Sequence, residues 1–196
     1  MKSLTVADAN FPNAPAPRPI QYPSPTQCLR CHSLAAGRVL GVRTLQLNSF
    51  YDYDGIEDIQ IRTWNHIGLF TSNIGRADRY NAHASLEDTS ASLESRSRAY
   101  LDSNCAFCHT PGGGTPVSLN LNSNVALSSM NAVDVVPSAG DLGIADARII
   151  APGDHTRSML WERMHTSDSV TRMPPIASVM PDETALDILA QWIDSL

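Results

Sequence analysis

The chain contains two short segments in which two cysteines and a histidine stand at a fixed spacing. Residues 28–32 read Cys-Leu-Arg-Cys-His, and residues 105–109 read Cys-Ala-Phe-Cys-His. The two segments hold all 4 cysteines of the 196-residue chain, each pair followed by a histidine: Cys28, Cys31 and His32, then Cys105, Cys108 and His109. C-x-x-C-H is the attachment motif of c-type haem, in which each thiol bonds a vinyl group and the adjoining imidazole binds the iron. We therefore expect two covalently attached haems.

Other uses of paired cysteines agree less well with this pattern. A four-cysteine zinc site normally has its two pairs much closer together than Cys28 and Cys105 stand in this sequence. A thioredoxin-like redox site needs one pair within a strand and helix pattern that this sequence lacks. Structural disulfides are a third possibility in a secreted chain. None of these alternatives explains why a histidine follows both pairs.

The composition excludes several classes of function. Charged residues make up only 17% of the chain, and 13 prolines and 11 glycines indicate many loops. The net charge of −6 is the opposite of what a nucleic-acid surface needs. Residues 91–196 carry 12 acidic and 6 basic side chains, so a protein that docks there is expected to be basic. The sequence has neither an apolar run long enough to cross a bilayer nor a signal peptide at its start, and no membrane span is predicted.

The elements around the two motifs predict a mainly α fold of two small, loop-rich haem units. We expect an extended, proline-rich arm over residues 1–27, a first haem unit with its connector over 28–90 and a second over 91–196. Apolar spacing predicts helices over residues 56–70, 92–104, 158–164 and 181–196. Residues 71–90 read as a connector, and residues 111–152 as a long irregular loop packed around a prosthetic group.

The second unit contains, in order, a predicted helix, C-x-x-C-H, a loop-rich middle, Arg172-Met173-Pro174-Pro175 and a predicted C-terminal helix. In this order of parts it resembles a class I cytochrome c domain. The resemblance implies that Met173 is the distal ligand of the second iron, and the chain between His109 and Met173 is long enough to circle a haem. A thioether is a soft ligand suited to iron, and the two prolines stiffen the segment that presents it.

Four further sequence strings lie around the two motifs: Gly37-Arg-Val-Leu-Gly41, Trp64-Asn-His-Ile-Gly-Leu-Phe70, Tyr100-Leu-Asp-Ser-Asn-Cys105 and Ile150-Ala-Pro-Gly-Asp154. Through these strings most of residues 26–196 resembles a bacterial family of di-haem c-type cytochrome modules, some of which are fused to propeller-type, sugar-dehydrogenase-like domains. The first unit departs from an ordinary cytochrome c because no Arg-Met-Pro-Pro segment follows His32.

The sequence leaves three possibilities for the distal side of the first iron. His66 is the leading candidate, because it follows His32 within the first unit and shares a helical face with Ile59, Leu69 and Phe70. A histidine that only packs beside the porphyrin is an equally acceptable interpretation. Met130 is the second candidate, and an open sixth position is the third.

These expectations predict electron transfer by a di-haem c-type cytochrome between a donor and an acceptor protein, one of which could be a dehydrogenase domain or subunit. With bis-His ligation at the first iron and His/Met at the second, electrons should rest on the second haem. A di-haem peroxidase-like or gas-binding enzyme with one open iron is the alternative, for which His66 or His83 could supply acid–base chemistry. Haem c is attached outside the bacterial inner membrane, so the motifs predict a periplasmic or extracellular protein, as a mature form or a fragment.

Several other side chains have weaker predicted roles. Arginines that could pair with haem propionates are Arg38, Arg43, Arg157 and Arg163. His83, His155 and His165 lie in polar stretches and are expected to be solvated. Trp64, Trp161 and Trp192 are expected to pack in a core or a haem pocket.

Overall fold

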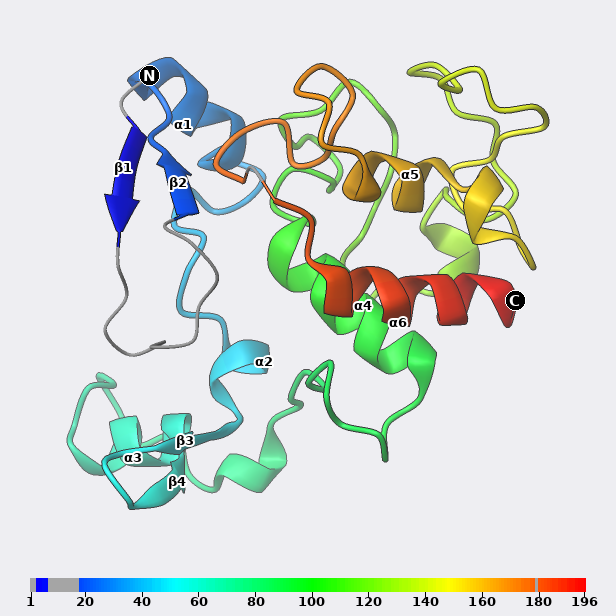
Figure 1. Cartoon of the computed structure of the whole chain (residues 1–196). Helices are drawn as coiled ribbons and strands as arrows, with labels where there is room; N and C mark the ends of the chain where they lie inside the picture. Colours follow the sequence, from blue (N-terminus) through cyan, green and yellow to red (C-terminus); the bar gives the residue numbers. More distant parts are fainter. Residues whose placement is uncertain (1–2, 7–17, 179) are drawn as a thin grey trace.

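The fold is known from a computed structural model, which describes residues 3–6, 18–178 and 180–196. Its described part contains six α-helices, three short 3-10 helices and two two-stranded antiparallel sheets (Figure 1). In chain order they are β1 (Ser3–Val6), β2 (Arg18–Gln21), α1 (Pro25–Cys31), α2 (Thr44–Leu47), β3 (Phe50–Asp52), β4 (Glu57–Ile59), α3 (Gln60–His66), η1 (Ala77–Arg79), α4 (Leu93–Asn104), η2 (Leu127–Ser129), η3 (His155–Arg157), α5 (Met159–His165) and α6 (Glu183–Asp194).

The second half of the chain, residues 91–196, is built on helices whose ends the sequence marks clearly. Ser92 accepts a hydrogen bond from the backbone of Ser95 and begins α4, as predicted. Asp182 does the same for Ala185 at the start of α6, and the predicted helices over 158–164 and 181–196 are confirmed as α5 and α6. Helix α6 packs against both α4 and α5. A hydrogen bond from the indole N–H of Trp161 in α5 to the carbonyl of Leu186 joins α5 to α6.

The buried core belongs almost entirely to this second half. It gathers side chains from α4, from the irregular segment 106–150 and from α6, with Leu101, Ala106, Leu121, Met130, Ala132, Ile150, Leu189, Trp192 and Ile193 at its centre. Among the described residues before position 91, Ile61 and Ala77 are the only buried hydrophobic side chains. The first half therefore folds with very little apolar interior of its own.

Two predictions for the first half are wrong in detail. Residues 56–70 do not form one helix, because Glu57–Ile59 pair with Phe50–Asp52 before α3 begins. Asp54 and Gly55 both have positive φ and form the two-residue turn that an Asp-Gly pair favours. The predicted arm also ends early: Ser24 caps α1 reciprocally with Gln27, and Pro25 occupies the first turn, where a proline is tolerated. Residues 7–17 of the arm lie outside the described residues.

The helices and strands of the first half form two separate groups. Figure 1 shows α1 beside β1 and β2 at one end of the molecule, whereas α3 and the β3–β4 hairpin lie at the opposite end. The connector is anchored to α2, since the backbone N–H of His83 donates to Leu45 and Asn48 donates to the carbonyls of Ala77 and Tyr80. No described helix is both long enough and apolar enough to span a membrane.

Candidate haem-attachment site

The first motif occupies the end of α1 and the turn after it. Cys28 is exposed, Cys31 is half-buried, and His32 ends the helix with its backbone N–H bonded to the carbonyl of Cys28. Gly37 and Arg38 both have positive φ, and this turn brings the Arg38 carbonyl oxygen to 2.6 Å from Nδ1 of His32. A carbonyl can only accept, so Nδ1 carries the proton and Nε2 is left with its lone pair. Metal-binding histidines are commonly oriented in this way.

The second motif follows the end of α4 as a continuous series of turns. Cys105 donates its backbone N–H to Leu101, and His109 donates its own to Cys105. The carbonyl of His109 accepts from Leu121, which ties the motif to the irregular segment that follows. The His109 ring is half-buried, its buried Nδ1 has no partner among the described residues, and burial lowers the pKa of the imidazole. Backbone hydrogen bonds thus hold residue His109 in place, and no hydrogen bond to a described residue occupies its ring.

The cysteines are free thiols, and the second pair is not activated. Burial raises the pKa of Cys105 and of Cys108 to about 12. A catalytic cysteine, which attacks its substrate as the thiolate at neutral pH, instead needs a lowered pKa. No group of three or more His, Cys, Asp or Glu side chains in the described part of the chain converges to hold a metal ion.

The two motifs lie directly against one another. Sγ of Cys31 is 3.6 Å from Sγ of Cys108, which also lies 3.4 Å from the carbonyl oxygen of Arg30. The backbone of Gly114 is so close to Arg30 that an added Cβ would overlap with the same carbonyl oxygen. Only glycine fits at this point. The sequence predicted the two motifs but contained no local signal that they would meet.

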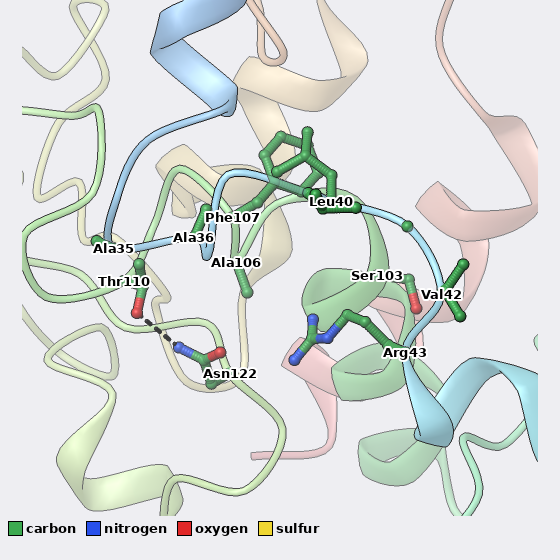
Figure 2. Close-up of a pocket in the computed structure, with 12 residues that line it drawn as sticks. Ala35, Ala36, Leu40, Val42, Arg43, Ser103, Ala106, Phe107, Thr110 and Asn122 are labelled. Carbon is green, nitrogen blue, oxygen red and sulfur yellow. Dashed lines mark hydrogen bonds between the residues drawn. The ribbon is translucent and has the colours of Figure 1, made fainter. Parts of the chain in front are cut away.

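A cavity of about 180 Å³ opens between the segment after the first motif and the second motif (Figure 2). Leu40 and Phe107 come together on one side of it, and Asn122 donates to Thr110 on the other. Apolar side chains that lie next to the cavity or to His32 are left in solvent: Leu29, Leu34, Val39 and Val42. The segment that contains the first motif and follows it therefore leaves four large apolar side chains exposed.

Asp102 joins the two halves beside this cavity. Its carboxylate is only 2% exposed and is bonded to the guanidinium of Arg43, to the backbone N–H of Ser123 and to the hydroxyl of Ser123. Nε2 of His83 lies 3.8 Å from the same carboxylate. Burial alone would raise the pKa of Asp102, but the pKa is held well below its usual range by His83, Ser123 and Arg43 together. Sequence reasoning missed Asp102, and a lone Asp on a predicted helix gave no signal for it.

The structure does not bring His66 to the first motif. His66 is exposed at the end of α3, and α3 and α1 lie at opposite ends of the molecule (Figure 1). Leu69, which was expected to belong to its apolar wall, is 60% exposed. Met130, the second candidate ligand, is 1% exposed and packs in the core of the second half. The short range of α3, which ends at His66, explains why the predicted helical face does not exist.

Met173 is half-buried, beside a small hollow that Met164 and Pro174 also line. Its backbone N–H donates to the carbonyl of Arg163, so the loop after α5 is fastened to that helix. The peptide bond from Met173 to Pro174 is cis. The exposed Met180 lines the same hollow.

The remaining predicted residues have varied surroundings. His83 is not solvated, because its side chain is only 12% exposed and lies beside Asp102. His155 pairs with Asp194, and His165 stacks on the ring of Trp161. The predicted propionate partners Arg43, Arg157 and Arg163 already hold protein groups, namely Asp102, Asp154 and the carbonyls of Ala139 and Thr171. Trp192 lies in the core as predicted, while Trp64 and Trp161 are half-buried.

The residues present fit covalently attached haem. Each motif offers two free thiols and a histidine, and Nε2 of His32 is free while the Nδ1 of His109 has no partner among the described residues. Exposed apolar side chains around the first motif provide surface that a macrocycle would cover. Comparisons of the chain with models of protein families, with curated proteins and with solved structures find no match.

Proposed function

We propose that this chain is a di-haem c-type cytochrome that relays electrons between redox partner proteins. The observation that carries the proposal is that every cysteine of the chain stands in a C-x-x-C-H motif, as a free thiol, with both motifs in contact. Bound haem iron supplies a centre that alternates between two oxidation states. The chain's own contribution is to attach, orient and shield that centre.

The chain supplies the proximal ligands through its two motif histidines. The Arg38 carbonyl fixes the tautomer of His32, because it accepts the Nδ1 proton and leaves Nε2 as the donor atom. His109 is held by the bonds of its backbone to Cys105 and Leu121. A ligand held in place before and after a change of oxidation state reduces the reorganisation that electron transfer requires.

Met173 is the proposed distal ligand in the second half. Its thioether would raise the reduction potential relative to a second histidine, so electrons would rest preferentially on the second centre. The fastening of the Met173 backbone to Arg163 supports a fixed position for this loop. For the first centre, the exposure of His66 at the far end of the molecule favours a different sixth ligand or an open position.

The contact between the motifs supports exchange within the molecule. The attachment sulfurs Cys31 and Cys108 are in van der Waals contact, so two groups bonded to them would start from the same point of the structure. An electron that arrives at either group would have a short path to the other. The acidic second half, with 12 acidic and 6 basic residues after position 90, would then dock a basic partner through a small transient interface.

The proposal is tested by production of the full chain in a bacterium that attaches haem c in its periplasm, the proposed compartment. Intact mass and the pyridine haemochrome spectrum should give two haems per chain. The paired substitution Cys28→Ser with Cys31→Ser should leave one haem, and so should Cys105→Ser with Cys108→Ser. A chain that carries no covalent haem would contradict the proposal.

Spectra of the oxidised protein separate electron transfer from the alternative function. Two low-spin electron paramagnetic resonance signals support a relay. A high-spin iron that binds cyanide and turns over peroxide would instead identify a peroxidase-like or gas-binding enzyme.

A further inference from the structure

Cys31 and Cys108 belong to different motifs, yet their sulfurs are 3.6 Å apart and both are free thiols. A disulfide bond has a length of about 2.05 Å, so a shift of roughly 1.5 Å, within reach of side-chain rotation, would join them. We propose that in the haem-free chain Cys31 and Cys108 form a disulfide that links the two haem-attachment motifs. This modification site is additional to the proposed haem function.

The backbone around the two sulfurs is as closely packed as the sulfurs themselves. Sγ of Cys108 lies 3.4 Å from the carbonyl oxygen of Arg30, the residue before Cys31. Gly114 rests on that same carbonyl, and a Cβ on Gly112 would lie 3.7 Å from Cβ of Ala35. Backbone contacts between the two segments therefore accompany the contact of the two sulfurs. The fold itself, and not only the two cysteine rotamers, brings the two motifs together.

The bond forms by ordinary thiol–disulfide exchange with an external disulfide, either a small molecule or a protein oxidant. One of the two cysteine sulfurs attacks the oxidant, forms a mixed disulfide and releases one thiol. The second cysteine then attacks the sulfur of the first and releases the other thiol. In total, Cys31 and Cys108 lose two protons and two electrons, and the oxidant disulfide becomes two thiols. An oxidising compartment supplies such a partner.

This link would compete with haem attachment at both motifs at once. Thioether formation needs a free thiol at each cysteine, and the disulfide removes one thiol from each C-x-x-C-H motif. A dithiol reductant would therefore have to reopen the bond before either motif could be completed. The disulfide itself does not depend on the proposed function; only this consequence does.

An unfolded chain would favour different pairings. Within each motif the two cysteines are separated by only two residues, whereas Cys31 and Cys108 lie far apart in the sequence. The probability of contact in a flexible chain falls with about the −3/2 power of the separation, which disfavours the long link by roughly 100-fold. A long link that predominates in native buffer would thus report the contact seen in the fold.

The test compares two full-length variants that each retain two cysteines. The variant C28S/C105S keeps Cys31 and Cys108, and the variant C31S/C108S keeps Cys28 and Cys105, which have the same separation along the sequence. Both are produced without haem-attachment machinery, reduced, and then exposed to glutathione disulfide. Alkylation and intact mass follow the intramolecular disulfide over time. We expect C28S/C105S to close at least tenfold faster in native buffer, and the two rates to be equal in concentrated urea.

Equal rates in native buffer, or faster closure of C31S/C108S, would overturn the proposal, and a haem-free chain that did not fold would give equal rates. A non-reducing peptide map of the unmodified, haem-free chain provides a second readout. It should show Cys31 linked to Cys108, and a map with within-motif pairs alone would contradict the inference. The haem count of the loaded protein is a separate measurement, so the proposed function and this inference can fail independently.

Discussion

Replacement of Asp102 with asparagine should weaken the joint between the two halves of the chain. The carboxylate is 2% exposed and accepts from the Ser123 backbone, the Ser123 hydroxyl and the Arg43 guanidinium. Hydrogen bonds to a charged group contribute about 1.5–3 kcal/mol each, but bonds that share one carboxylate are not additive. Arg43 is 37% exposed, so water compensates part of its loss. We expect D102N to lower the free energy of unfolding by about 3 kcal/mol.

Urea unfolding of the haem-loaded chain, followed by far-ultraviolet circular dichroism at pH 7, measures this difference. In a thermal scan the same loss corresponds to a decrease in Tm of about 6–12 °C for a chain of this size. The matched control is Asp78→Asn, because Asp78 also pairs with an arginine but is 59% exposed. D78N should leave both the unfolding midpoint in urea and the Tm unchanged within experimental error. A loss below about 1 kcal/mol in D102N would refute the reasoning.

The pH dependence of D102N provides a second check on the same cluster. The folded pKa of Asp102 lies below its unfolded value of about 3.9, so its stabilisation is complete above that value and is lost as pH falls through the folded pKa. The stability gap between wild type and D102N should therefore shrink as the pH falls below about 4. A gap that widens on acidification would show that another group causes it.

The remaining predictions concern the ligands and the contact between the motifs. Met173→Ala should convert one low-spin signal to high spin and lower the potential of the second haem, whereas the exposed neighbour Met180 can be changed to alanine without either effect. His66→Ala should leave both haem spectra unchanged because α3 lies apart from α1; loss of a low-spin signal would restore His66 as a ligand. Gly114→Ala should slow closure of the Cys31–Cys108 disulfide at least tenfold by forcing a Cβ onto the Arg30 carbonyl, while Gly41→Ala, in open space, should not; equal rates would argue against the packing.

The sequence predicted those parts of the fold whose signals are local. Ser92 before a helical apolar pattern marks the start of α4, and Pro181 with Asp182 marks the start of α6. The β3–β4 hairpin was missed although Asp54-Gly55 is a strong turn signal, because the apolar residues after it also fit a helical period. The turn signal and the helical pattern overlap in this segment. Residues 57–59 form a strand because they pair with residues 50–52.

Some features of the candidate site are encoded within one short segment, and others depend on contacts between segments far apart in the sequence. The C-x-x-C-H spacing is local, so both motifs could be found from the sequence alone. The contacts of Cys31 with Cys108 and of Arg43 with Asp102 join segments far apart in the chain, and no pattern within either segment encodes them. The predicted role of His66 depended on a helix that would extend beyond it. Because α3 ends at His66, the residues expected to form its apolar wall do not share a helical face with it.

The first half of the chain has a much smaller core than the second, so contacts with the second half hold the first motif in position. The second half buries a continuous core around Leu101 and Trp192, whereas the first half buries only Ile61 and Ala77 among its described hydrophobic residues. The first motif therefore owes its position to contacts with the second half, through Arg43 and Asp102 and through Arg30 and Gly114. A haem attached at Cys28 and Cys31 would cover exposed side chains such as Leu34 and Val39, which are 77% and 73% exposed. Attachment at the first motif should consequently stabilise the chain more than attachment at the second, where the apolar interior already exists.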